Sequence, residues 1–255
     1  MKFLFYLLAL LTPWVVFSQK TEGEVTYTET IKLKIDIPDG PDAGAMRKMI
    51  PSERSVSKTL YFNDKESLFM DSPQQKEGDG DVNVESNNAD GDMQFQVKMA
   101  RPENRQWRNH AQGGMVESTE FFGRFFLITD EPKKMKWKVG TEQKQILGYA
   151  CQKAVLQDTT RKVEAWFTTA IPVAIGPSEF GDLPGLILEM SMAGGDRSIV
   201  ATKVDLKKLD SKAIEKPTKG KKVTRDEFNK TRDEKMKEMG AEPGGNGMMK
   251  VIIRN

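Results

Sequence analysis

Cys151 and His110 are the two side chains that could support nucleophilic catalysis. Each is the single residue of its type among the 255 residues of the chain. A thiolate attacks efficiently when a histidine lies within hydrogen-bond reach to take its proton. The two residues lie far apart in the sequence, and no local motif joins them. The sequence therefore favours a small buried thiol at Cys151 and predicts no catalytic residue. A thiol-dependent enzyme that uses Cys151 is the alternative.

Soft-metal chemistry is a second alternative, because the chain holds 14 methionines. Thioethers and a thiol can bind Cu(I) outside the cytoplasm. Met190 and Met192, however, lie two positions apart, which is also how core residues are placed on one face of a strand. A single histidine leaves few ligands for zinc or non-haem iron. The sequence predicts no metal site and no cofactor, and an extracytoplasmic copper-handling protein stays as the alternative.

Aromatic residues near Cys151 offer walls for an apolar ligand. Trp166, Phe167 and Phe180 flank a segment rich in proline and glycine. A rigid loop with apolar walls is typical of small-molecule pockets. These three aromatic residues and Cys151 are therefore the candidate ligand-binding residues.

The same segment is predicted to form a rigid corner, because proline restricts its own φ and the residue before it. Pro184 and Gly185 fit the central positions of a type II turn, in which the glycine takes a positive φ. The corner leads directly into the apolar strand 186–188. The residues of this structural motif are Gly148, Cys151, Pro172, Gly176, Pro177, Leu183, Pro184 and Gly185.

Short strands must position these residues. Apolar and polar residues alternate from Val25 to Ile37, which predicts a half-buried strand. A hairpin is predicted around the loop 63–66. The polar stretches 73–92 and 102–114 are predicted loops, the first acidic and flexible, and a turn is expected at 141–144. About eight to ten strands predict an all-β, mainly antiparallel fold, built as a single strongly curved sheet or half-barrel.

The two ends of the chain differ from this β-rich domain, which is expected to span residues 19–210. Residues 1–18 have a basic start, an apolar centre and a neutral end, which is typical of a cleaved signal peptide. A basic linker begins at residue 211, and a capping box at Thr224 and Glu227 then predicts a short C-terminal helix over 225–239. Few apolar residues indicate that this helix is exposed and loosely docked. In the tail up to residue 255, the apolar stretch 248–253 could add an edge strand.

The charge balance argues against nucleic acid as a partner. The net charge is +2 with 30% charged residues, whereas nucleic-acid binding needs a clustered basic excess. The signal peptide predicts export to the periplasm, the outer membrane or the medium. Membrane contact is expected only through that peptide.

Between Trp137 and Ile187 the chain resembles the GLPGLI family of exported bacterial proteins. The resemblance rests on ILGYACQKA at 146–154, AWF at 165–167, the pairs 171–172 and 176–177, and DLPGLI at 182–187. Asp182 stands where the name motif begins with glycine. The resemblance implies an exported protein of the Gram-negative cell envelope, and it supplies neither an activity nor a catalytic residue.

The export signal, the strand count and the clustered aromatic residues favour a non-enzymatic envelope protein. We expect a binding, carrier or accessory module for an apolar ligand or an envelope protein. The comparison of a half-barrel with lipoprotein carriers concerns the fold alone.

Overall fold

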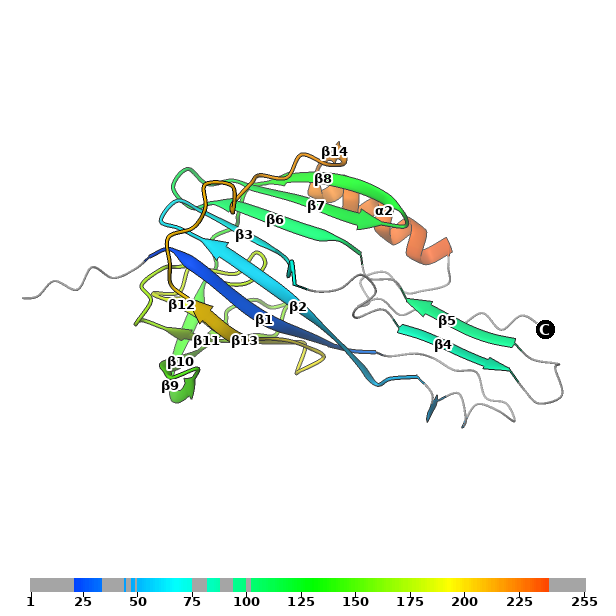
Figure 1. Cartoon of the computed structure of the whole chain (residues 1–255), viewed down its shortest axis with the longest axis horizontal. Helices are drawn as coiled ribbons and strands as arrows, with labels where there is room; N and C mark the ends of the chain where they lie inside the picture. The colour runs from blue at the N-terminus through cyan, green and yellow to red at the C-terminus, as the bar shows by residue number, and fades with distance from the viewer. Residues whose placement is uncertain are drawn as a thin grey trace, which may run out of the picture.

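The computed structural model describes residues 21–33, 44, 47–48, 50–74, 82–87, 94–99 and 102–238. The predicted signal peptide and the predicted tail strand at 248–253 lie outside these residues. The described part of the chain is all-β, with one open, mostly antiparallel sheet and one short C-terminal helix, α2 (Arg225–Glu238) (Figure 1). The predicted fold class is confirmed. No helix in the described ranges has the length and apolar character needed to cross a membrane.

Within these ranges, twelve strands form the main sheet in the order β14-β8-β7-β6-β3-β2-β1-β13-β12-β11-β10-β9, while β4 and β5 pair separately. All neighbours pair antiparallel except β14 and β8, which are parallel. The strands are β1 (Gly23–Lys32), β2 (Glu53–Phe62), β3 (Glu66–Asp71), β4 (Val82–Asn87), β5 (Gln94–Met99), β6 (Asn104–Asn109), β7 (Met115–Phe121), β8 (Arg124–Asp130), β9 (Trp137–Ile146), β10 (Tyr149–Leu156), β11 (Val163–Thr168), β12 (Leu186–Met192), β13 (Arg197–Asp205) and β14 (Lys221–Val223).

The first strands follow the predicted pattern. Alternate residues of β1 are buried, including Val25 and Tyr27, as the period of two requires. The hairpin of β2 and β3 is also confirmed. The Oδ1 atom of Asn63 accepts hydrogen bonds from the backbone N–H groups of Lys65 and Glu66, each at 2.8 Å, and thereby fixes the turn.

Three segments predicted to be loops or turns contain strands instead. β4 lies within 73–92, β6 lies within 102–114, and β9 continues through 141–144. Of these segments only β6 adds a strand to the main sheet, which has twelve strands rather than eight to ten. β6 gives little apolar signal because its side chains at Gln106 and Arg108 are polar although both are buried.

The sheet is strongly curved, with β14 and β8 at the top of Figure 1 and β9 at the bottom. β8 and β9 are ten steps apart in the sheet order, which would be about 48 Å in a flat sheet. Residues 131–136 alone connect them, and this connection, here called the strap, spans at most about 24 Å. The strap therefore lies across the open mouth of the curled sheet.

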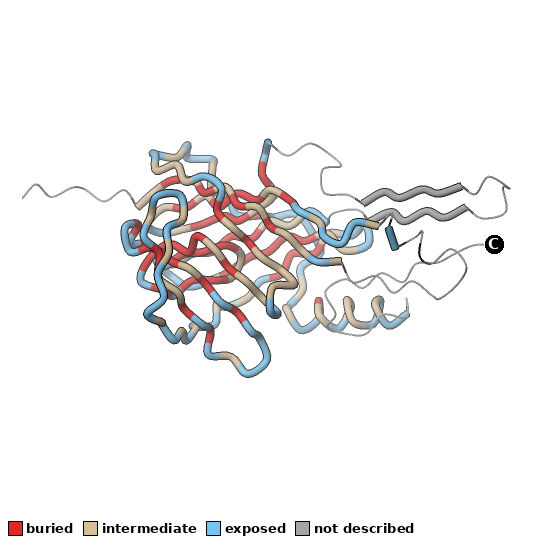
Figure 2. Tube along the Cα trace, turned by 90° about the horizontal axis from the view of Figure 1, so that it is seen from below, coloured by how far each residue is buried: buried red, intermediate tan, exposed pale blue. Residues whose placement is uncertain are grey.

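Residues 169–185, here called the plug, fill one end of the hollow inside the sheet. From β6, Arg108 donates hydrogen bonds through Nη1 to the carbonyls of Glu179 and Phe180, at 2.8 and 3.0 Å. From β9, Trp137 donates through Nε1 to the carbonyl of Gly181 at 2.8 Å. The buried residues concentrate in the curled sheet, whereas α2 consists of exposed and intermediate residues except for the buried Phe228 (Figure 2). The plug residues buried in the main core are Ile171, Val173, Ile175, Phe180 and Leu183.

Helix α2 begins at the predicted residue and contacts the sheet through few side chains. The capping box is present, with Thr224 N–H donating to Glu227 at 2.8 Å and Glu227 N–H donating to Thr224 at 3.2 Å. Phe228 is buried against the rings of Phe121 and Phe126, with ring centroids 6.0 and 5.4 Å away. Phe228 is the single buried residue of α2, and this aromatic side chain anchors the helix to the sheet.

Candidate functional site

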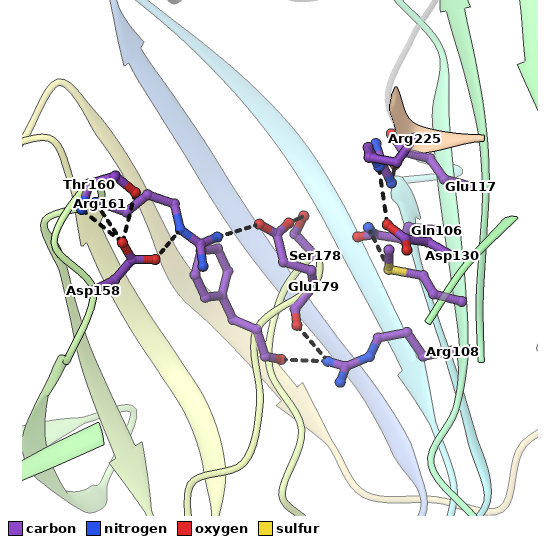
Figure 3. A network of polar contacts seen from close by, with 12 residues as sticks. Gln106, Arg108, Glu117, Asp130, Asp158, Thr160, Arg161, Ser178, Glu179 and Arg225 are labelled. Carbon is purple, nitrogen blue, oxygen red and sulfur yellow. Dashed lines mark hydrogen bonds and ion pairs between the residues drawn. The ribbon is translucent and has the colours of Figure 1, made fainter. Parts of the chain in front are cut away.

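A polar cleft of about 840 Å³ opens beneath the strap. Its walls come from the strap, the plug, the β10–β11 loop, strands β6 and β7, and the start of α2. Two groups of polar side chains face each other across it (Figure 3). The lining residues are Asn104, Gln106, Met115, Glu117, Asp130, Glu131, Pro132, Lys133, Lys134, Met135, Lys136, Leu156, Gln157, Asp158, Thr160, Arg161, Ser178, Glu179, Arg197, Arg225, Phe228 and Arg232.

Arg225 organises one wall of the cleft. Its Nη2 lies 2.6 Å from Oε2 of Glu117, and its Nε lies 3.4 Å from Oδ2 of Asp130. The other oxygen of Glu117 accepts a hydrogen bond from Nδ2 of Asn104 at 2.7 Å. Burial lowers the pKa of Arg225, but the two carboxylates more than offset this effect, so its pKa lies above the ordinary value. The first residue of α2 is thereby fixed to β7 and β8 as a permanent cation.

Gln106 also lines the cleft, and its side-chain amide has a weaker hydrogen-bond partner. The only described acceptor of its Nε2 is the sulfur of Met115, at 3.2 Å. A thioether accepts hydrogen bonds poorly, although the amide of Gln106 is buried. This amide is therefore a group that a ligand in the cleft could satisfy better than the protein does.

The facing wall is built around Arg161. Its Nε lies 2.8 Å from Oδ2 of Asp158, and its Nη1 lies 3.3 Å from Oε1 of Glu179 in the plug. Asp158 also accepts hydrogen bonds from the backbone N–H and the hydroxyl of Thr160, at 2.8 and 2.7 Å. These hydrogen bonds, led by that of the Thr160 N–H, lower the pKa of Asp158, so the carboxylate is ionised at neutral pH. Ser178 donates to the second oxygen of Glu179 at 2.8 Å.

Charged residues continue onto the inner face of β1, β2, β3 and β13. Lys58 lies 2.5 Å from Asp71 and 3.9 Å from Glu29. Arg197, which also lines the cleft, lies 2.5 Å from Glu29. These ion pairs occupy buried positions that an apolar carrier would fill with aliphatic side chains. The hollow is thus apolar around the plug and polar toward the cleft.

The candidate ligand-binding residues from the sequence lie away from this cleft. Cys151, Phe167 and Phe180 are 2, 1 and 3% exposed and belong to the main hydrophobic core. Trp166 is half-buried, and the Nζ of Lys144 lies 4.3 Å from the centroid of its ring. The structure brings these residues together as packing around the plug rather than as lining of the described cleft.

Cys151 has the environment of a structural thiol. Its sulfur donates to the carbonyl of Tyr149 at 3.5 Å, and burial raises its pKa despite the opposing charge of Lys144. The side chain of His110 instead contacts the hydroxyl of Ser67 at 2.9 Å. Among the described residues, no hydrogen bond joins the thiol to the imidazole. An activated nucleophile needs the opposite shift of the thiol pKa.

The corner of the plug differs from the predicted turn. Gly185 does not have the positive φ that a type II turn requires. Instead, its N–H donates to the carbonyl of Leu183 at 2.8 Å, which closes a three-residue turn centred on Pro184. The glycine is needed for close approach, because a Cβ there would lie 2.0 Å from the carbonyl oxygen of Thr168.

The remaining residues of the predicted structural motif lie in turns or in close packing contacts. Gly148 has φ of 82° in the turn between β9 and β10. A Cβ on Gly176 would lie 2.6 Å from a methyl group of Ile187. Pro172 is the centre of a three-residue turn from Ile171 to Val173, and the carbonyl of Pro177 accepts from Phe180 N–H at 3.2 Å.

Sequence reasoning missed the residues of the cleft. Asn104, Gln106 and Arg108 do repeat with a period of two, and this polar alternation is the signal from which β6 could have been found. No comparable signal joins Glu117 to Arg225, which are 108 positions apart. Only the curl of the sheet and the docking of α2 bring them together.

The fold and the cleft define an open, curled β-domain with a polar mouth. Residues 82–229, more than half of the chain, match the family described as N-glycanase peptide, N-terminal domain, and the chain belongs to this family. Two solved structures of PNGF-II, in space groups P21 and C2, are similar at 18% identity with a TM-score of 0.48. The match covers 82% of this chain and 32% of the PNGF-II chain, so this chain spans about a third of that length. None of the curated proteins matches. The resemblance to the GLPGLI family stays a prediction.

Proposed function

We propose that this chain is an exported, non-enzymatic carbohydrate-binding module that takes a hydroxyl-rich chain into the cleft beneath the strap. The observation that carries the proposal is the chemistry of the two facing walls. Carboxylate, guanidinium and amide groups converge there from elements that are far apart in the sequence. Sugar hydroxyls both donate and accept hydrogen bonds, so they can use all three kinds of group.

Preorganisation of the walls supports binding. Arg225 is held by two carboxylates, and Arg161 likewise bridges Asp158 and Glu179. Side chains that are already fixed lose little conformational entropy when a ligand arrives. Membership in a family named for the N-terminal domain of an N-glycanase peptide also supports a glycan rather than another polar ligand.

The proposal changes the ligand expected from the sequence. A carrier for an apolar ligand needs an apolar hollow, and the aromatic residues that suggested one are packed in the core. The cleft is instead lined mostly by charged and amide side chains. An accessory binding module therefore keeps the non-enzymatic role and replaces the apolar ligand by a polar one.

Calorimetric titration of the secreted chain with an N-glycan released from a glycoprotein tests the proposal. Replacement of Gln106 by Leu should weaken binding about tenfold, because one hydrogen bond to a buried amide is lost. Gln143→Leu is the matched control, since Gln143 is exposed on the edge strand β9 and does not line the cleft. Binding of a fatty acid in preference to the glycan, or release of the glycan from a glycopeptide by the chain alone, would overturn the proposal.

A further inference from the structure

We infer that helix α2 is a movable wall of the cleft, and that Phe121 and Phe126 are positioning residues that hold this wall for the ligand. The docking of α2 and the binding of a saccharide then stabilise each other. This inference rests on the proposed function and concerns the regulation of the same site. It comes from the place of the anchors of α2 and from the space on either side of the helix.

One face of α2 forms part of the cleft. Arg225, Phe228 and Arg232 line the cleft, and their spacing of three and four residues places them on one stripe of the helix. A ligand that contacts these side chains therefore contacts α2 only while the helix is docked against the sheet.

The anchors that hold α2 to the sheet lie in its first turn. Phe228 is the single buried residue of the helix, and its ring contacts Phe121 of β7 and Phe126 of β8, with centroid distances of 6.0 and 5.4 Å. Arg225 supplies ion pairs to one carboxylate of β7 and one of β8. Residues 229–238 contain no buried side chain. The helix is therefore held at one end, and the rest of its length lies on the surface (Figure 2).

Open space borders α2 on both sides. Away from the cleft, a second hollow of about 480 Å³ lies between α2 and the strands β8 and β14. The residues of α2 that line this hollow form a second stripe, on the other side of the helix from the first. They are Glu227, Lys230, Thr231 and Glu234. A helix packed into a dense core cannot shift without leaving voids, whereas α2 can tilt into either hollow.

Undocking of α2 should cost far less free energy than unfolding of the sheet. A helix of fourteen residues is marginal in water on its own, so α2 depends on its docking contacts. Partly exposed ion pairs such as those of Arg225 contribute little, so the aromatic seat formed by Phe121 and Phe126 carries most of the docking. Segments with so few buried contacts open locally.

Ligand binding and helix docking are linked by thermodynamics. A ligand that binds only the docked form of α2 shifts the equilibrium toward docking. Docking must in turn raise the affinity for the ligand by the same factor. Phe121 and Phe126 thereby act on the ligand through Phe228, although neither of them lines the cleft.

Hydrogen–deuterium exchange of the secreted chain, with and without a biantennary N-glycan, tests the coupling. With free glycan at about ten times its Kd, the amides of α2 should exchange about tenfold more slowly, because only the docked form binds. Strand β9 is the internal reference, since it forms the other edge of the sheet and none of its residues lines the cleft. Unchanged exchange in α2, or equal slowing in α2 and β9, would overturn the inference.

The variant Phe121→Ala separates positioning from direct contact with the ligand. Loss of the edge-to-face contact with Phe228 should speed the exchange of α2 about tenfold in the free protein, and saturating glycan should slow it again. The glycan affinity should fall by the same factor as the docked fraction of α2. Phe121→Leu keeps an apolar seat and should recover most of the slow exchange. Phe122→Ala is the matched control, since this neighbouring ring is 58% exposed and contacts Phe121 rather than Phe228.

The outcomes separate this inference from the proposed function. Glycan binding with no selective effect on α2 overturns the coupling and leaves carbohydrate binding in place. Absence of glycan binding overturns both. Full affinity in Phe121→Ala, despite faster exchange of α2, would show that the helix takes no part in binding and also overturns the inference. Exchange in β1 confirms that the sheet is intact in each variant.

Discussion

Asp182 and Met135 are joined by a hydrogen bond in which the backbone N–H of Met135 donates to Oδ2 of the carboxylate at 2.8 Å. The bond connects the plug to the strap, and so connects the packed end of the curled sheet to its open mouth. Asp182 has a φ of 65°, in the left-handed region that glycine adopts most easily. Aspartate at this position therefore accepts some backbone strain and gains an anchor for the strap that glycine cannot provide.

Substitutions at Asp182 should separate the side-chain effect from the backbone effect. We expect the loss of unfolding free energy to rise in the order Asp182→Asn, Asp182→Gly, Asp182→Ala. Asparagine keeps an acceptor and tolerates positive φ, glycine loses the acceptor but relieves the backbone, and alanine does neither. The alanine variant should lie about 1 kcal/mol below the glycine variant in urea denaturation. Equal stability of these two variants would show that the backbone conformation carries no cost.

Gly185→Ala should destabilise the protein by about 3 kcal/mol or more, because the new methyl group cannot avoid the backbone of β11. Its Cβ would lie 2.0 Å from the carbonyl oxygen of Thr168. Gly140→Ala is the control, since a Cβ there meets its nearest atom, the carbonyl oxygen of Lys153, at an ordinary 3.6 Å. That variant should change the unfolding free energy by less than about 0.5 kcal/mol. Similar melting curves for the two variants would contradict the described corner.

The sequence predicts the apolar parts of this fold much better than the polar parts. β1 is found because Val25 and Tyr27 repeat with the period of a strand and are buried. β6 is missed because its inward side chains are polar: Gln106 contacts the sulfur of Met115, and Arg108 donates to backbone carbonyls of the plug. A search for apolar alternation cannot find a strand whose inner face is polar.

The cleft could not be predicted from the sequence, for a different reason. The aromatic residues near Cys151 suggested a ligand site, and they form the core around the plug. The cleft residues come together only after a twelve-stranded sheet has curled and α2 has docked. Both events depend on contacts between distant segments, such as Arg225 with Glu117, for which local patterns carry no information.

The thiol of Cys151 should resist alkylation in the native protein. Burial raises its pKa and leaves the side chain 2% exposed, so little thiolate is available to react. We expect iodoacetamide to label Cys151 only as fast as the protein opens, with full labelling in denaturant. Mass spectrometry of a time course at pH 8 measures this directly. Rapid labelling of the folded chain would instead revive the thiol-dependent enzyme.

His110 should make the protein less stable as the pH falls from about 6.5 to about 4. Burial, followed by the nearby charge of Arg108, lowers the pKa of His110 to about 4 in the folded state, and the opposing effect of Asp182 is smaller. An unfolded chain takes up the proton near pH 6.5, so between these two values the unfolded state binds more protons. Lower pH therefore favours unfolding, and the stabilisation is present in full only above pH 6.5.

The half-buried imidazole should account for about 1–2 kcal/mol of this loss, after allowance for solvent screening. The measurement is the difference in unfolding free energy between the unaltered chain and His110→Gln, taken from urea denaturation at several pH values. That difference should change between pH 6.5 and 4 and stay constant above pH 6.5. The carboxylates titrate alike in both proteins, so their contribution cancels in the difference. Ser67→Ala is the control, since it removes the partner at 2.9 Å but keeps the titrating ring, and its pH dependence should follow that of the unaltered chain. Parallel curves for His110→Gln and the unaltered chain would place the acid sensitivity in other groups.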